Sequence, residues 1–183
     1  EFLPWLNGTA LEIQLGDWVI AHALAQRQRW QQAGLDLELS INVSPKHLQS
    51  PGFIEHLRAE LLKYPELPPH SLQIEVLEST ALEDMGAALS IMQACHAMGI
   101  DFALDDFGTG YSSLTYLCKL PVNIIKIDQS FIQDLSSGKA EDAAIVQAIV
   151  QLGDTLGLLT LAEGVETQEQ AERLHQLGCH KAQ

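Results

Sequence analysis

The chain has 183 residues, 46% of them hydrophobic, which is a size and composition typical of one globular domain. Its 24 acidic and 10 basic residues give a formal net charge of −14, which argues against nonspecific binding to DNA, RNA or anionic lipid. No run of about 18 apolar residues occurs, so the sequence predicts no transmembrane helix.

Helical and extended patterns alternate along the whole chain. Apolar residues recur at helical intervals in the longer segments, and several of these segments are followed by glycine, a common helix end. The predicted helices cover residues 11–32, 53–63, 85–98, 112–119, 140–156 and 167–177. The predicted strands cover residues 37–43, 72–77, 101–104, 122–127, 158–162 and 179–183. Short connections between these alternating segments predict an α/β fold with parallel strands.

Polar side chains recur at or near the carboxyl ends of the successive apolar strands. They are Asn42, Glu75, Asp105, Lys126, Glu163 and Gln183. Parallel α/β barrels and open parallel sheets both assemble their active sites at that edge. A charged residue within a buried strand is costly unless it is paired or bound to a metal. The six positions therefore favour a metal-centred site over a set of unrelated solvated strand ends.

The stretch DFALDDFGTGYSSL, residues 101–114, carries the clearest local signal of such a site. Its predicted strand is followed by two adjacent carboxylates, Asp105 and Asp106, and then by a glycine turn. Like charges disfavour each other's ionisation, and a divalent cation removes that cost. Taken alone, the pair also fits a solvated turn with two N-capping aspartates. The glycines do not form a dinucleotide fingerprint, because Ser113 stands where the third glycine is needed.

Several motifs resemble those of the EAL domain family, bacterial phosphodiesterases specific for cyclic di-GMP. They are DDFGTGYSSL at 105–114, KIDQSFI at 126–132, AEGVET at 162–167, NVS at 42–44 and EVLES at 75–79. The resemblance spans nearly the whole chain. It implies a TIM-like (β/α)8 barrel of the EAL type, incomplete in this chain. It also implies hydrolysis of cyclic di-GMP to linear pGpG with two divalent cations, Mg²⁺ or Mn²⁺.

The same resemblance implies roles for individual residues. Lys126 resembles the residue that contacts the attacking water, and Asp105 resembles a ligand that bridges the two cations. With Glu163, these two are the implied catalytic residues. The implied metal ligands are Asn42, Glu75, Asp105, Asp106 and Glu163. The implied loop-anchoring or substrate-site residues are Glu78, Thr109, Glu166 and Gln183.

Three of these residues have alternative interpretations. Lys126 also fits a salt bridge with Asp128, which lies two residues on and faces the same side of a strand. Glu78 also fits a carboxylate at the start of a helix. Glu163 fits a metal ligand or a proton acceptor, and the sequence does not separate these roles.

The family's Glu-Ala-Leu motif is absent from the sequence and is expected just upstream of residue 1. We therefore expect a single EAL-like phosphodiesterase domain over residues 1–183, truncated at both ends, and inactive if the chain were the whole molecule. The alternative to the enzyme is a catalytically inactive cyclic di-GMP receptor or regulatory domain. A third hypothesis is a structural or dimerisation module, which would not explain the six polar strand ends.

Partners and location are expected from the same observations. The three cysteines show neither zinc-site nor disulfide spacing, which favours a reducing cytosol. We expect a bacterial cytoplasmic domain, alone or as the cytoplasmic part of a membrane-anchored sensor. The resemblance further implies a homodimer and fusion to sensory or cyclase domains.

Overall fold

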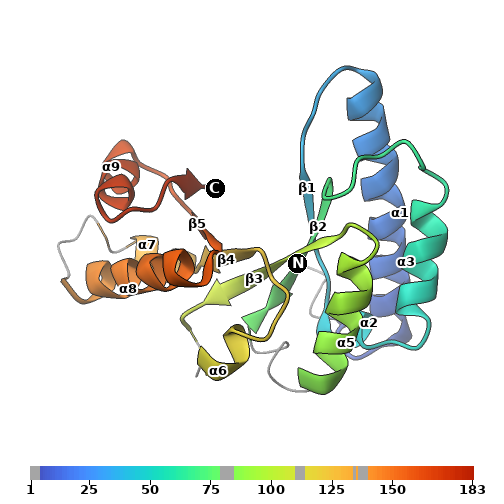
Figure 1. Cartoon of the computed structure of the whole chain (residues 1–183), viewed down its shortest axis with the longest axis horizontal. Helices are drawn as coiled ribbons and strands as arrows, with labels where there is room; N and C mark the ends of the chain where they lie inside the picture. The colour runs from blue at the N-terminus through green and yellow to red at the C-terminus, as the bar shows by residue number, and fades with distance from the viewer. Residues whose placement is uncertain (1–4, 79–84, 110–113, 134, 136–139) are drawn as a thin grey trace. The chain divides into compact units, whose positions relative to one another are not determined.

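The computed structural model describes residues 5–78, 85–109, 114–133, 135 and 140–183 (Figure 1). The chain divides into two compact units. The first unit contains Glu1–Val76 and Thr80–Phe102, and the second contains Leu77–Ser79 and Ala103–Gln183. Asn42 and Glu75 consequently belong to the first unit, whereas the remaining polar strand ends belong to the second.

The first unit combines a pair of parallel strands with packed helices. Its elements are α1 (Ala10–Gln32), β1 (Leu39–Asn42), α2 (Pro45–Leu48), α3 (Phe53–Leu61), β2 (Leu72–Leu77, whose last residue belongs to the second unit) and α5 (Met85–His96). Strands β1 and β2 are paired from Leu39 and Leu72 at one end to Asn42 and Glu75 at the other. Helix α1 contacts β1 and lies beside α3 (Figure 1). Buried apolar side chains from these elements form the core of the unit, among them Leu24, Leu57, Ile74 and Met92.

The second unit contains a parallel sheet with helices between its strands. Its elements are β3 (Asp101–Phe107, whose first two residues belong to the first unit), α6 (Leu114–Leu117), β4 (Ile124–Ile127), α7 (Gln129–Gln133), α8 (Ala140–Leu156), β5 (Leu159–Ala162), α9 (Gln168–Gln176) and β6 (Lys181–Ala182). Strands β3, β4, β5 and β6 pair in that order and are parallel. Helix α8 packs on β4 and β5 (Figure 1). Because the strands are parallel, their carboxyl ends lie at one edge of the sheet.

The turn between β5 and α9 is held by side chains. The Thr167 hydroxyl accepts a hydrogen bond from the Gln170 amide at 3.2 Å, and the Gln170 side-chain oxygen accepts one from the Thr167 amide at 3.0 Å. This reciprocal capping box satisfies backbone donors that the first turn of a helix leaves unpaired. It also fixes where the chain leaves the carboxyl end of β5, directly after Glu163.

The predicted α/β class with parallel strands is confirmed, and the strand at 72–77 and the helix at 140–156 have the predicted bounds. The predicted strand at 101–104 is too short, because β3 continues through Asp105 and Asp106 to Phe107. The sequence did not indicate the short helix α7. The predicted start of the helix at 112–119 falls among residues 110–113, which lie outside the described residues. Within the described part of the chain, no helix is long and apolar enough to cross a membrane.

Candidate functional site

The end of β3 has an irregular backbone that presents two neighbouring carboxylates. The register between β3 and β4 shifts between Leu104 and Phe107, which is the pattern of a β-bulge. Asp106 lies at this shift with a φ of 53°, in the left-handed region that few residues other than glycine, asparagine and aspartate adopt readily. Its amide donates a hydrogen bond to Asp105 Oδ1 at 3.2 Å. The bulge therefore re-aims the two side chains at the point where the strand ends.

Lys126 is a buried cation on β4 beside these carboxylates. Its side chain is only 5% exposed, and its Nζ lies 3.1 Å from Asp105 Oδ1. It also forms an ion pair with Glu163, which follows β5. The partners come from the strands on either side of β4. Asp128, the alternative partner considered from the sequence, accepts hydrogen bonds from the amide and hydroxyl of Ser130.

Three carboxylates of the second unit gather into one cluster. One carboxylate oxygen from each of Asp105, Asp106 and Glu163 lies within 4.8 Å of the other two. Oxygens bound to one Mg²⁺ at about 2.1 Å lie roughly 3 to 4 Å apart, so the cluster has the right scale for a small cation. A donor set of carboxylate oxygens suits Mg²⁺ or Mn²⁺, whereas zinc sites usually include nitrogen or sulfur. These three residues fit a divalent cation.

Asp128 joins the cluster through Asp106, although the sequence suggested it only as a partner of Lys126. Burial raises the pKa of Asp106, and the charge of Asp105 and a hydrogen bond with Asp128 raise it further. Burial alone would raise the pKa of Asp128, but hydrogen bonds from Ser130 and Asp106 lower it. The two carboxyls thus share a proton-dependent contact. The available signal in the sequence was the place of Asp128, directly after the predicted strand that carries Lys126; the structure puts it just beyond the end of β4.

The raised pKa of Asp106 predicts a pH-dependent effect of Asp106→Asn on stability in the absence of divalent cations. A carboxyl whose pKa is higher in the folded protein favours folding below its unfolded value of 3.8 and loses that contribution as the pH rises. At pH 7, Asp106→Asn should therefore raise the free energy of unfolding by about 1 kcal/mol, the scale of a like-charge contact at 4 Å in water. Asparagine also tolerates the positive φ of this position.

Urea denaturation in EDTA at pH 7 and at pH 4 measures the effect. The difference between Asp106→Asn and the unmodified protein should shrink toward the lower pH, because the raised pKa of Asp106 increases the fraction of protonated carboxyl there. An equal or larger stabilisation at pH 4 would show that repulsion among the carboxylates is not its origin.

Glu78 holds the turn at Gly108, directly after β3. Its side chain is buried, and its Oε2 accepts a hydrogen bond from the Gly108 amide at 3.1 Å. Gly108 has a φ of 99°, a conformation that favours glycine. Thr109 is exposed, and its hydroxyl donates a hydrogen bond to the Asp106 carbonyl at 2.9 Å. Both contacts lie within the second unit and stabilise the turn that carries Asp106.

Gln183 and Glu166 flank the end of β5. The Gln183 amide donates a hydrogen bond to the Ala162 carbonyl at 2.8 Å, which places residue 183 beside the strand end that leads to Glu163. Glu166 is exposed, its amide donates to Gln170 Oε1 at 2.9 Å, and it is not a member of the three-carboxylate cluster. Gln183 thus pairs with the residue that precedes Glu163 of the cluster. Glu166 instead belongs to the capped turn before α9.

Asn42 and Glu75 lie side by side in the first unit. They are the last paired positions of β1 and β2, and the Val43 amide donates a hydrogen bond to the Glu75 carbonyl at 3.0 Å. Glu75 is only 6% exposed. An amide oxygen and a carboxylate at adjacent strand ends are both donors that Mg²⁺ accepts.

The comparisons with known proteins agree on one family. The EAL domain model matches residues 1–183. The bifunctional diguanylate cyclase/cyclic di-GMP phosphodiesterase MucR of Pseudomonas aeruginosa is 45% identical over 184 residues, covering all of this chain and 27% of that protein. The cyclic di-GMP phosphodiesterase PA2567 of the same organism is 39% identical over 183 residues, covering 100% of this chain and 31% of its own length.

A solved structure described as "PaMucR Phosphodiesterase, c-di-GMP complex" superposes with a TM-score of 0.93 at 45% identity, covering all of this chain and 73% of that one. The chain spans about a third or less of the length of the two curated relatives.

Proposed function

The chain belongs to the EAL domain family, and on this premise we propose that it carries a metal-dependent phosphodiesterase site that hydrolyses cyclic di-GMP to linear pGpG. The observation that carries the proposal is the buried Lys126, ion-paired with Asp105 and Glu163 inside a cluster of three carboxylates. A structural ion pair needs one carboxylate for one lysine. The excess negative charge here is what a site for divalent cations requires.

In this proposal Asp105, Asp106 and Glu163 hold divalent cations, with Asn42 and Glu75 as further ligands, as the family resemblance implies. Bound Mg²⁺ or Mn²⁺ supplies Lewis-acid activation of water and neutralises charge on the phosphoryl group. The protein's net charge of −14 would otherwise disfavour a substrate with two phosphates.

The protein's own groups position the reactants. The two carboxylate partners of Lys126 fix the direction of its ammonium group, which contacts the attacking water, as the family resemblance implies. Water attacks phosphorus, the bond from phosphorus to the 3′ oxygen breaks, and a proton passes to the 3′ oxygen. Glu163 stands where it can accept the proton of the attacking water or hold a cation. The Glu78–Gly108 hydrogen bond keeps the turn directly after β3 in place during these steps.

The experiment is an assay of the protein that carries this chain together with any natural flanking sequence. Cyclic di-GMP is incubated with Mn²⁺ or Mg²⁺, and the products are separated by chromatography. Formation of pGpG that stops on addition of EDTA supports the proposal. Binding of cyclic di-GMP without turnover would instead indicate the receptor, and neither binding nor turnover would contradict both functions.

We also propose that the domain is part of a larger protein. A domain that aligns with about a quarter of a bifunctional cyclase and phosphodiesterase is consistent with fusion to sensory or cyclase domains in a larger cytoplasmic protein. A homodimer is proposed from the resemblance, and the molar mass in solution tests it.

A further inference from the structure

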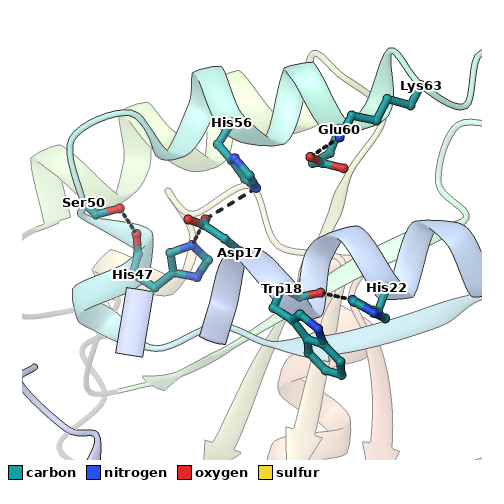
Figure 2. Close-up of polar contacts among 8 residues, drawn as sticks. All are labelled: Asp17, Trp18, His22, His47, Ser50, His56, Glu60 and Lys63. Carbon is teal, nitrogen blue, oxygen red and sulfur yellow. Dashed lines mark hydrogen bonds and ion pairs between the residues drawn. The ribbon is translucent and has the colours of Figure 1, made fainter. Parts of the chain in front are cut away.

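The first unit contains a polar cluster outside the carboxylate cluster described above. His47 of α2 is 1% exposed, and its Nε2 lies 2.9 Å from Asp17 Oδ1 of α1. His56 Nε2 of α3 lies 3.6 Å from the same oxygen. Figure 2 shows both imidazoles directed at Asp17. The Phe53 ring meets the His47 ring edge-on at 5.1 Å. Three helices of the unit thus converge on one carboxylate.

The backbone of α1 is shaped to admit the His47 ring. A Cβ atom at Gly16 would lie 2.0 Å from His47 Nδ1, well inside any allowed contact, so only glycine fits there. Nδ1 has no hydrogen-bond partner among the described residues. The ring is therefore best satisfied as the tautomer in which Nε2–H donates to Asp17, since an N–H at Nδ1 would be buried without an acceptor.

The segment that leaves β1 is tied to the backbone of His47, whose ring is held by Asp17. Only residues 43 and 44 separate Asn42 from α2, and Ser44 Oγ accepts a hydrogen bond from the His47 amide at 3.2 Å. The His47 carbonyl accepts a hydrogen bond from the Ser50 hydroxyl at 2.7 Å, which closes the short helix (Figure 2). Lys46 adds a second link to the start of α1 through the Gly8 carbonyl. A shift of α2 would consequently move the end of β1.

We propose that His47, clamped between Asp17 and Gly16, is a positioning residue for Asn42. This inference rests on the proposed function, in which Asn42 is a ligand of a divalent cation. Asn42 is exposed and is the last paired residue of β1, so its side-chain direction depends on how the following turn is held. Partners that orient a ligand typically change metal affinity 10- to 100-fold when they are removed.

The test measures Mn²⁺ affinity by titration calorimetry, independently of activity. His47→Leu and Asp17→Ala should weaken Mn²⁺ binding roughly 10- to 100-fold. Asp17→Asn should stay within about threefold of the unmodified protein, because asparagine Oδ1 still accepts the Nε2–H bond. Unchanged affinity in both His47→Leu and Asp17→Ala would overturn the proposal.

A matched control separates positioning from general loss of stability. Leu24→Ala lies on the same helix as Asp17 and removes a fully buried side chain, so it lowers stability without removing the Asp17–His47 contact. Urea denaturation identifies conditions in which this variant is folded, and its Mn²⁺ affinity under those conditions should be unchanged. A loss equal to that of His47→Leu would show that stability alone controls the affinity and would overturn the proposal.

A double-mutant cycle with Asn42→Ala tests the route of the effect. If His47 acts through Asn42, His47→Leu should cause no further loss of affinity in the Asn42→Ala background. Additive losses would contradict that route. If Asn42→Ala by itself leaves Mn²⁺ affinity unchanged, Asn42 is not a ligand, and both its place in the proposed ligand set and the positioning role of His47 fail. If Asn42→Ala weakens binding and His47→Leu does not, only the positioning role fails.

Discussion

Asp105→Asn is expected to abolish hydrolysis of cyclic di-GMP, with a fall in kcat of more than about 100-fold, above the usual effect of outer-shell partners. Asp105 contacts Lys126 and belongs to the three-carboxylate cluster. Asparagine has the same shape, and its Oδ1 can still accept the hydrogen bond from the Asp106 amide. The substitution therefore removes a charged ligand while leaving the turn in place. The rate of pGpG formation at saturating Mn²⁺ measures the effect.

Asp154→Asn provides the matched control for this substitution. Asp154 is an exposed aspartate on α8 of the same unit, so the variant has the same change in net charge and should keep full activity. The equivalent change in the first unit, Glu75→Gln, should be as damaging as Asp105→Asn. If either site variant kept more than a tenth of the activity, that residue would be removed from the proposed ligand set.

Lys126→Met is expected to lower kcat by about 10²- to 10³-fold, the usual cost of removing one donor that stabilises developing charge. Methionine fills the buried space on β4 without supplying a charge. In EDTA the free energy of unfolding of the variant should also be lower by about 1–3 kcal/mol, because Asp105 and Glu163 lose the lysine ammonium with which both are paired. Added Mn²⁺ should then stabilise Lys126→Met more than it stabilises the unmodified protein.

Lys119→Met is the corresponding control, because Lys119 is an exposed lysine of the second unit. It should change neither kcat nor the stabilisation by Mn²⁺. Assays of activity and urea denaturation with and without Mn²⁺ compare the two variants. If Lys126→Met lost activity but showed no extra response to Mn²⁺, Lys126 would act on the reactants without balancing the carboxylates in the cation-free protein.

Much of the secondary structure could be predicted because it depends on local patterns. The apolar run at 72–77 and the helical spacing at 140–156 each contain the information for one element. The end of β3 was harder to predict. Adjacent aspartates are poor strand formers, so the strand was expected to end at residue 104, yet it continues through them. Pairing with β4 and a bulge at Asp106 override the local preference.

The amino-acid sequence by itself determined the alternation of strands and helices, the motifs of the EAL family and the polar residue at each strand end. Only the tertiary structure decided which of these groups meet. Lys126 had a nearby candidate in Asp128, but parallel pairing of β4 with both neighbours directs it to Asp105 and Glu163. Likewise, only packing of α1 against α2 brings Gly16 and Asp17 to His47. Residue spacing determines which side chains share a face of one strand or helix. Contacts between residues tens of positions apart depend on strand register and on the packing of the elements.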